Sequence, residues 1–171
     1  MFKNLTIGKK KYLDVEDEIK AVKSKLEDLN DSFLKLAAKD NYAFDKVMTA
    51  FKLPKETDEQ KKMRAEKIEE ATFAAAIVPS EVIEFCRQAI PLVQKAADIG
   101  NQNSVSDAGV AASLLSTAAE GAFLNVIINC TSLTNKTHGQ ELMKKSEISC
   151  EEVKNKSAKI ISSIKSRIYN T

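Results

Sequence analysis

Residues 100–129 read GNQNSVSDAGVAASLLSTAAEGAFLNVIIN, and this stretch decides what fold we expect. Ala, Ser and Gly dominate it, so a helix formed here would carry little side-chain bulk and would let neighbouring helices approach closely. Asn, Ser and Asp stand at its start and Asn stands at its end, where they would cap the helix or hold a ligand. We therefore expect a helix from Ser104 to about Asn129 at the centre of a packed structure.

Helical periodicity continues on both sides of this stretch, because apolar residues recur there at steps of three and four. Thr57 and Gln60 fit a capping box, Pro79 interrupts the helix that follows, and Pro91 should kink the next one unless a local bulge absorbs the lost hydrogen bond. Gly100 fits a left-handed helix C-terminus. The sequence thus predicts an all-α antiparallel bundle of about five helices, at residues 14–51, 57–76, 80–99, 104–129 and 140–169.

Composition limits the classes of protein to which the chain can belong. Its 171 residues suit a single domain, 1–171, and 26 basic against 24 acidic side chains leave a net charge of +2, too small to indicate nucleic acid as a partner. Cys86, Cys130 and Cys150 are far apart and odd in number, which argues against a disulfide framework or a zinc site and favours a reducing cytoplasm. No signal-peptide pattern is visible, and no apolar run reaches the roughly 18 residues of a membrane span, so we expect none.

Asp40 interrupts the apolar stripe of the first predicted helix. The stripe passes through Leu36 and Phe44, and the stripe position between them is Asp40. A carboxyl group buried there would need partners or would favour its protonated form, and a carboxyl that exchanges protons near neutrality is a candidate general acid or base. The alternative is that the bundle opens at this turn, where Lys39 and Asn41 are polar, and leaves Asp40 in water.

Polar residues at the two ends of the small-residue helix are further candidates. Ser104 and Asp107 fit a capping box, the structural interpretation, whereas Asn103 and the free amides of the helix start could bind a polar ligand. Asn125 and Asn129 lie four residues apart on one helix face. If buried, their amides require partners from neighbouring helices or from a ligand.

A basic run precedes the first predicted helix. Gly8 is followed by Lys9, Lys10 and Lys11. Such a run is usually a solvated stretch, but here it could attract the carboxylates of an anionic substrate. We keep Gly8 and Lys9 as candidate substrate contacts.

Four segments, taken together, resemble the cyclodeaminase/cyclohydrolase family. They are NLTIGKKKY at 4–12, DNYAFDKVMTAFKLPK at 40–55, IGNQNSVSDAGVAASLL at 99–115 and EGAFLNVIIN at 120–129. They follow the family's order, and the resemblance covers nearly the whole chain. The family includes the cyclodeaminase domain of formiminotransferase-cyclodeaminase and free-standing bacterial relatives, among them methenyltetrahydrofolate cyclohydrolases.

The resemblance implies an all-helical homodimer and folate chemistry in a cleft where subunits meet. Family members close 5-formiminotetrahydrofolate to 5,10-methenyltetrahydrofolate with loss of ammonia, or hydrolyse the methenyl bridge to 10-formyltetrahydrofolate. The substrate implied here is a tetrahydrofolate derivative, free or polyglutamylated, and neither reaction requires a metal or a further cofactor. No membrane or nucleic-acid partner is implied.

The resemblance also assigns roles to residues. An Asp four residues before the Phe of an Ala-Phe pair is the family's catalytic residue, and that position is Asp40, ahead of Ala43 and Phe44. The positions expected to line or support the folate site are Asn103, Ser104, Asp107 and Asn125.

The chain departs from the family at its N-terminus. Relatives usually begin with a further helix introduced by a PxPGGGS-like turn, whereas this sequence starts at Met1 directly before the first matching segment. We expect that helix to be lacking, either because the sequence is a fragment or because this variant has lost activity. The alternative to an enzyme is therefore a non-catalytic folate-binding or structural helical dimer. The residues do not distinguish deaminase from hydrolase.

Overall fold

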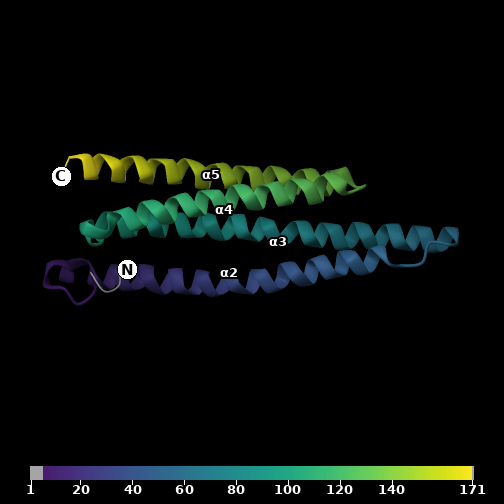
Figure 1. The fold of residues 1–171 in the computed structure, drawn as a ribbon, viewed down its shortest axis with the longest axis horizontal. Helices are drawn as coiled ribbons and strands as arrows, with labels where there is room; N and C mark the ends of the chain where they lie inside the picture. Colours follow the sequence, from purple (N-terminus) through teal and green to yellow (C-terminus); the bar gives the residue numbers. More distant parts are fainter. Residues whose placement is uncertain (1–5, 171) are drawn as a thin grey trace.

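The computed structural model describes residues 6–170, and the regular elements within that range are all helical. Figure 1 shows the four long helices running antiparallel in turn, with α3 between α2 and α4. The prediction of an all-α antiparallel bundle is confirmed. The elements are η1 (Lys10–Val15), α2 (Glu16–Phe51), α3 (Asp58–Ile99), η2 (Gln102–Ser104), α4 (Val105–Ser132) and α5 (Lys136–Tyr169).

The helix α3 begins as the sequence predicts and ends differently. The Thr57 hydroxyl accepts a hydrogen bond from the Gln60 amide at 3.2 Å, and the Gln60 side chain accepts one from the Thr57 amide, which completes the capping box. Gly100 follows the last residue of α3, as expected. Its backbone is extended, with φ −80° and ψ −176°, so the predicted left-handed ending is wrong.

The predicted break at Pro79 is also wrong, because α3 is one helix of 42 residues that contains both Pro79 and Pro91. A proline lacks the amide that would bond to the carbonyl four residues earlier, which for Pro79 is the carbonyl of Ala75. In this protein Asn129 of α4 supplies the missing donor, with its Nδ2 3.4 Å from the Ala75 oxygen. The described residues therefore form four long helices, with the second and third predicted helices joined.

The small residues of α4 lie at the centre of the bundle, as predicted. Ala108, Ala112, Ala119 and Ala122 are at most 7% exposed, and α4 packs along both α3 and α5. Their small side chains keep the backbones close. The buried hydroxyl of Ser157 in α5 consequently reaches the carbonyl of Ala112, at 2.7 Å.

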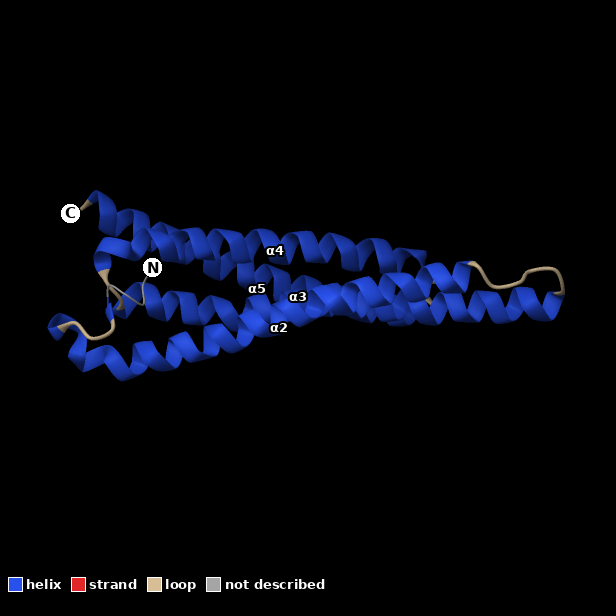
Figure 2. Ribbon diagram, turned by 60° about the horizontal axis from the view of Figure 1, so that its bottom comes forward, coloured by secondary structure: helices blue, strands red, loops and turns tan. Residues whose placement is uncertain are grey.

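The helix α2 packs along α3 but hardly touches α4, which leaves a groove between α2 and α4 with α3 as its floor. Figure 2 shows this separation. The α2–α3 hairpin also extends past the connection between α4 and α5 (Figure 1), and the Arg64 guanidinium braces its tip by donating to the Phe51 carbonyl at 3.0 Å. Two cavities lie in this groove.

The helix α4 carries apolar residues on its exposed side as well as on its buried side. By length and composition, one helix in the described part of the chain, Gln102–Ser132, could cross a membrane, with a mean hydropathy of 1.5 and 22% of its apolar window buried. The sequence-based expectation that no segment could do so relied on uninterrupted apolar runs, which the Ser and Thr residues of α4 break up. Much apolar surface of α4 faces outward.

Candidate functional site

A cleft of about 680 Å³ lies in the groove between α2, α3 and α4. Its walls are mostly apolar and include Phe33, Phe44 and Val78. A few polar side chains interrupt this lining, and a concave apolar surface with few polar groups is typical of small-molecule sites. The polar side chains are Asp40 and Asn41 from α2 and Asn125 and Asn129 from α4.

The carboxyl group of Asp40 opens onto this cleft. Asp40 continues the stripe of Leu36 and Ala43, each 7% exposed, which packs α2 against α3. Asp40 itself is exposed, which agrees with the alternative that the bundle opens at this turn and not with a buried carboxyl group. The physical reason is that α4 stands away from α2 at this level, and the stripe there faces the open cleft instead of a packed helix.

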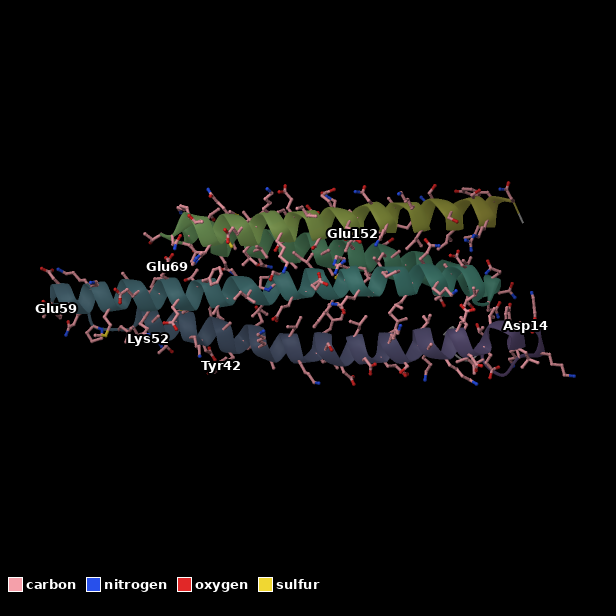
Figure 3. All side chains as sticks on the ribbon, turned by 180° about the vertical axis from the view of Figure 1, so that it is seen from behind. Asp14, Tyr42, Lys52, Glu59, Glu69 and Glu152 are labelled. Atoms are coloured by element: carbon pink, nitrogen blue, oxygen red, sulfur yellow. The ribbon has the colours of Figure 1, made fainter. Side chains whose placement is uncertain are left out.

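The neighbours of Asp40 are held away from its carboxylate. The ammonium group of Lys39 bonds to both carboxylate oxygens of Glu81 in α3, at 2.7 and 2.6 Å, and so joins α2 to α3 beside the cleft. Tyr42 lies on the outer side of α2 (Figure 3), 62% exposed, with the ammonium of Lys46 over its ring. Asp40 lines the cleft, and among the described residues no cation is bonded to its carboxylate.

The two α4 amides that line the cleft have different partners. Asn129 donates to the Ala75 carbonyl in α3 and supports the helix at Pro79. Asn125 donates to the Gly121 carbonyl in its own helix, at 3.1 Å, and is exposed. Only Asn129 thus bridges helices, whereas Asn125 presents its side chain to the cleft.

The remaining predicted site residues gather at the other end of the bundle. The buried hydroxyl of Thr6 accepts from the Asn101 amide at 3.2 Å, which ties the segment before η1 to the α3–α4 connection. Gly8 follows with φ +76°, a conformation that glycine adopts without strain, and its amide donates to Glu16 at 2.9 Å. Lys9 is exposed there and lines neither cavity of the groove.

The predicted capping box of Ser104 and Asp107 is wrong. Ser104 is 5% exposed and makes no side-chain cap. Asn101 caps this region instead, because its side chain accepts a hydrogen bond from the amide of Asn103 at 3.0 Å. The reason is that the short 3-10 helix η2 precedes α4, so the first free amides of the helical segment lie just after Asn101. Asn103 itself is exposed.

Asp107 faces a second cavity, of about 370 Å³, in the same groove. Its Oδ2 atom is buried and has no hydrogen-bond partner among the described residues. The walls around it come from α2, α3 and α4 and from Ile7. They are mostly apolar, but α2 also contributes Lys23, Glu27, Asn30 and Asp31. A carboxylate oxygen in such a place is suited to a ligand that donates a hydrogen bond.

One chain does not bring all the predicted residues together. Asp107 and Asn125 are 18 residues apart on α4, which is five turns, so they share a helix face but lie about 27 Å apart along its axis. Asp40 and Asn125 line one cavity, while Gly8, Lys9, Asn103, Ser104 and Asp107 lie toward the end that contains the other. Sequence reasoning also passed over Asn41 as a site residue, although its position beside Asp40 was a usable signal.

Comparison with known proteins gives a consistent result. A family model described as formiminotransferase-cyclodeaminase matches residues 1–148. The methenyltetrahydrofolate cyclohydrolase of Methylorubrum extorquens is 41% identical over 165 residues, which cover 96% of this chain and 79% of that protein. The formimidoyltransferase-cyclodeaminase of Mus musculus is 28% identical over 167 residues, 98% of this chain and 31% of that protein. This chain therefore spans under a third of the mouse relative.

A solved structure is similar over almost the whole chain. The crystal structure of formiminotetrahydrofolate cyclodeaminase from Thermotoga maritima superposes with a TM-score of 0.84 and 27% sequence identity, covering 98% of this chain and 80% of that one. The helical arrangement is therefore shared with a solved relative, as well as the sequence.

Proposed function

Because this chain belongs to the formiminotransferase-cyclodeaminase family, we propose that it is an enzyme of folate one-carbon metabolism that acts on a tetrahydrofolate derivative. Hydrolysis of 5,10-methenyltetrahydrofolate to 10-formyltetrahydrofolate is the first candidate reaction, since the relative at 41% identity is named a methenyltetrahydrofolate cyclohydrolase. Cyclodeamination of 5-formiminotetrahydrofolate is the second, supported by the relatives named cyclodeaminases. The observation that carries the proposal is a carboxylate that lines a mostly apolar cleft of about 680 Å³, a volume within the usual range of small-molecule sites.

In this proposal Asp40 is the general base and then the general acid. Its carboxylate takes a proton from the water that attacks the electrophilic methenyl carbon. The adduct then collapses to a formyl group on N10, with cleavage of the bond from that carbon to N5. One proton of the water ends on N5 and the other is released to solvent. General acid–base catalysis of this kind contributes roughly 10²- to 10⁴-fold to the rate.

The other lining residues would bind and orient the substrate. The walls at Phe33 and Phe44 suit the flat pterin, and the amides of Asn41 and Asn125 suit its polar edge. Holding the one-carbon unit against Asp40 supplies much of the rate in reactions of this type. The chemistry requires no metal or cofactor beyond the folate itself. The ammonium group of Lys9, which follows Gly8 in an exposed segment, would attract the carboxylates of a polyglutamylated tail.

We further propose that the enzyme is a cytoplasmic homodimer of this single domain. The outward apolar surface of α4 supports a dimer, because exposed patches of this kind usually mark interaction surfaces. The two groups of predicted site residues, far apart in one chain, would also be closer together if each cleft were completed by a second copy. The three free cysteines suit a reducing compartment.

The test is turnover of both substrates by the wild-type protein, Asp40→Asn and a matched control. Asp45→Asn is the control, because Asp45 is an exposed carboxylate on the same helix that does not line the cleft. We expect Asp40→Asn to lower kcat roughly 10²- to 10⁴-fold with unchanged circular dichroism, and Asp45→Asn to keep wild-type turnover.

Full activity of Asp40→Asn would remove this residue from the mechanism. If the wild-type protein converted neither substrate, the enzyme proposal would be wrong. Calorimetric titration with folinic acid would then separate a folate-binding protein, which releases or absorbs heat on binding, from a purely structural dimer, which does not.

A further inference from the structure

We propose that the backbone carbonyl of Ala75 is a binding group of the cleft, and that it accepts a hydrogen bond from an N–H group of the bound folate ring. Pro79 is the positioning residue that makes this carbonyl available. The inference rests on the proposed function, since its ligand is the folate derivative proposed above. It concerns the floor of the cleft, whereas Asp40, Asn41 and Asn125 come from the helices on either side.

One side of α3 forms the floor of the cleft. Its lining residues share one face of the helix, and they are Ala75, Val78, Pro79 and Val82. In an α-helix each carbonyl points along the axis toward the amide four residues later, so the Ala75 oxygen points toward position 79. The carbonyl group therefore lies on the side of α3 that faces the cleft, between two residues that line it.

The Ala75 carbonyl can accept a further hydrogen bond. Pro79 has no N–H group, so the ordinary helical donor is missing. The donor that replaces it, Nδ2 of Asn129, is 3.4 Å away, which is longer than the common N–H···O distance of about 2.9 Å. A carbonyl oxygen has two lone pairs, so a molecule in the cleft can donate a second, shorter hydrogen bond to it.

The second proline of α3 has no such relation to the cleft. Pro91 deprives the carbonyl of Arg87 of its helical donor in the same way. Pro91 is exposed, and neither it nor Arg87 lines the cleft. Of the two prolines in α3, only Pro79 places an acceptor on the cleft side, and Pro91 therefore serves as a matched control.

A folate ring carries the donors that this acceptor requires. Its pyrimidine part has N–H groups at N3 and on the 2-amino substituent. The Ala75 carbonyl lies among the apolar side chains of Val78, Pro79 and Val82, where a hydrogen bond is stronger than in water. Because an acceptor left unpaired beneath a bound ligand is costly, this arrangement also disfavours ligands of similar shape that lack the donor.

The first test is the affinity for folinic acid, measured by calorimetric titration on the wild-type protein, Pro79→Ala and Pro91→Ala. An alanine at position 79 has an N–H group that bonds to the Ala75 carbonyl within α3 and so competes with the ligand. We expect Pro79→Ala to raise Kd roughly tenfold, the loss of about one hydrogen bond, and Pro91→Ala to keep the wild-type Kd. In turnover, KM should rise with Kd while kcat changes less than about twofold, because the pyrimidine edge is not part of the reacting bridge.

A second variant separates the N–H group from the proline ring. Lactic acid at position 79, incorporated as the hydroxy-acid counterpart of alanine, has the alanine side chain but an ester oxygen in place of the N–H group. It therefore leaves the Ala75 carbonyl without a helical donor, as Pro79 does. We expect this protein to bind folinic acid with nearly the wild-type Kd, although it lacks the ring. A role of Pro79 in packing or in bending the helix would weaken binding equally in both variants.

An unchanged Kd of Pro79→Ala would overturn the inference, and so would an equal loss in Pro91→Ala or a failure of the ester variant to recover affinity. Circular dichroism checks that all the variants remain helical. A wild-type protein that did not bind folinic acid would overturn the inference together with the proposed function. Wild-type binding and turnover, with an unchanged Kd of Pro79→Ala, would overturn this inference alone.

Discussion

The hydrogen bond from Asn129 to Ala75 predicts a measurable coupling between α4 and Pro79. Pro79 deprives the Ala75 carbonyl of its helical donor, and the Asn129 amide replaces it at 3.4 Å. Removing one partner of a partly buried hydrogen bond typically costs 1–3 kcal/mol, and this bond is long. We therefore expect Asn129→Ala to lower the free energy of unfolding by about 1 kcal/mol, at the low end of that range.

The same substitution should cost almost nothing in a Pro79→Ala background. An alanine at position 79 has its own amide, which can bond to the Ala75 carbonyl within α3. The double-mutant cycle should then give a coupling free energy of about 1 kcal/mol between positions 79 and 129. Urea denaturation followed by circular dichroism measures all four proteins, and the Asn129→Ala difference corresponds to roughly 2–4 °C in Tm for a chain of this size.

Asn125→Ala is the matched control for this cycle. Asn125 is also an amide on α4, but it donates to its own helix at Gly121 and is exposed. Its substitution should change the free energy of unfolding little, with or without Pro79. An equal cost of Asn129→Ala in both backgrounds would refute the reasoning, since it would mean that Asn129 does not replace the amide lost at the proline.

Two further predictions follow from pKa values that the fold perturbs. The amide of Thr134, at 2.8 Å, and that of Asn135 lower the pKa of Glu69, which lies beneath the α4–α5 connection (Figure 3). A lowered folded-state pKa stabilises the protein above the unfolded pKa, and this contribution is lost as the pH falls. Glu69→Gln should therefore lower Tm at pH 7, with a difference that narrows on acidification; a difference independent of pH would contradict this. Burial raises the pKa of Cys86 and of Cys150 to about 11, so neither thiol should react with a disulfide reagent at pH 8 until denaturant is added. Rapid labelling of the native protein at either cysteine would count against their burial.

Local chemistry accounts for the parts of the fold that sequence could predict. The capping box at Thr57 depends only on two residues three positions apart. The long helix up to Phe51 was predictable because its apolar residues recur continuously at helical spacing. The central position of α4 was likewise predictable, because a helix rich in Ala, Ser and Gly allows neighbouring helices to pack closely against it. Such features depend on residues that are close together along the chain, so they can be predicted from the sequence.

Other features depended on partners from distant segments. Pro79 is expected to interrupt an isolated helix, and here Asn129, 50 residues later, lies beside it and donates to the Ala75 carbonyl that the proline leaves without its helical donor. Ser104 fits a cap by its spacing, yet it is buried, and Asn101 caps instead. The local sequence allows either Ser104 or Asn101 to cap, and only the packing of the other segments decides which of the two does so.

Asp40 shows the same division within the candidate site. Its interruption of an apolar stripe was visible in the sequence by itself, and that was enough to select it. Its exposure was not predictable, because burial at a stripe position depends on whether a second helix covers it. Here α4 packs on α3 and α5 and leaves α2 alone at that level, so the position opens onto a cleft. Periodicity determines which side of a helix points inward, whereas only the placement of the other helices determines whether that side meets protein or open space.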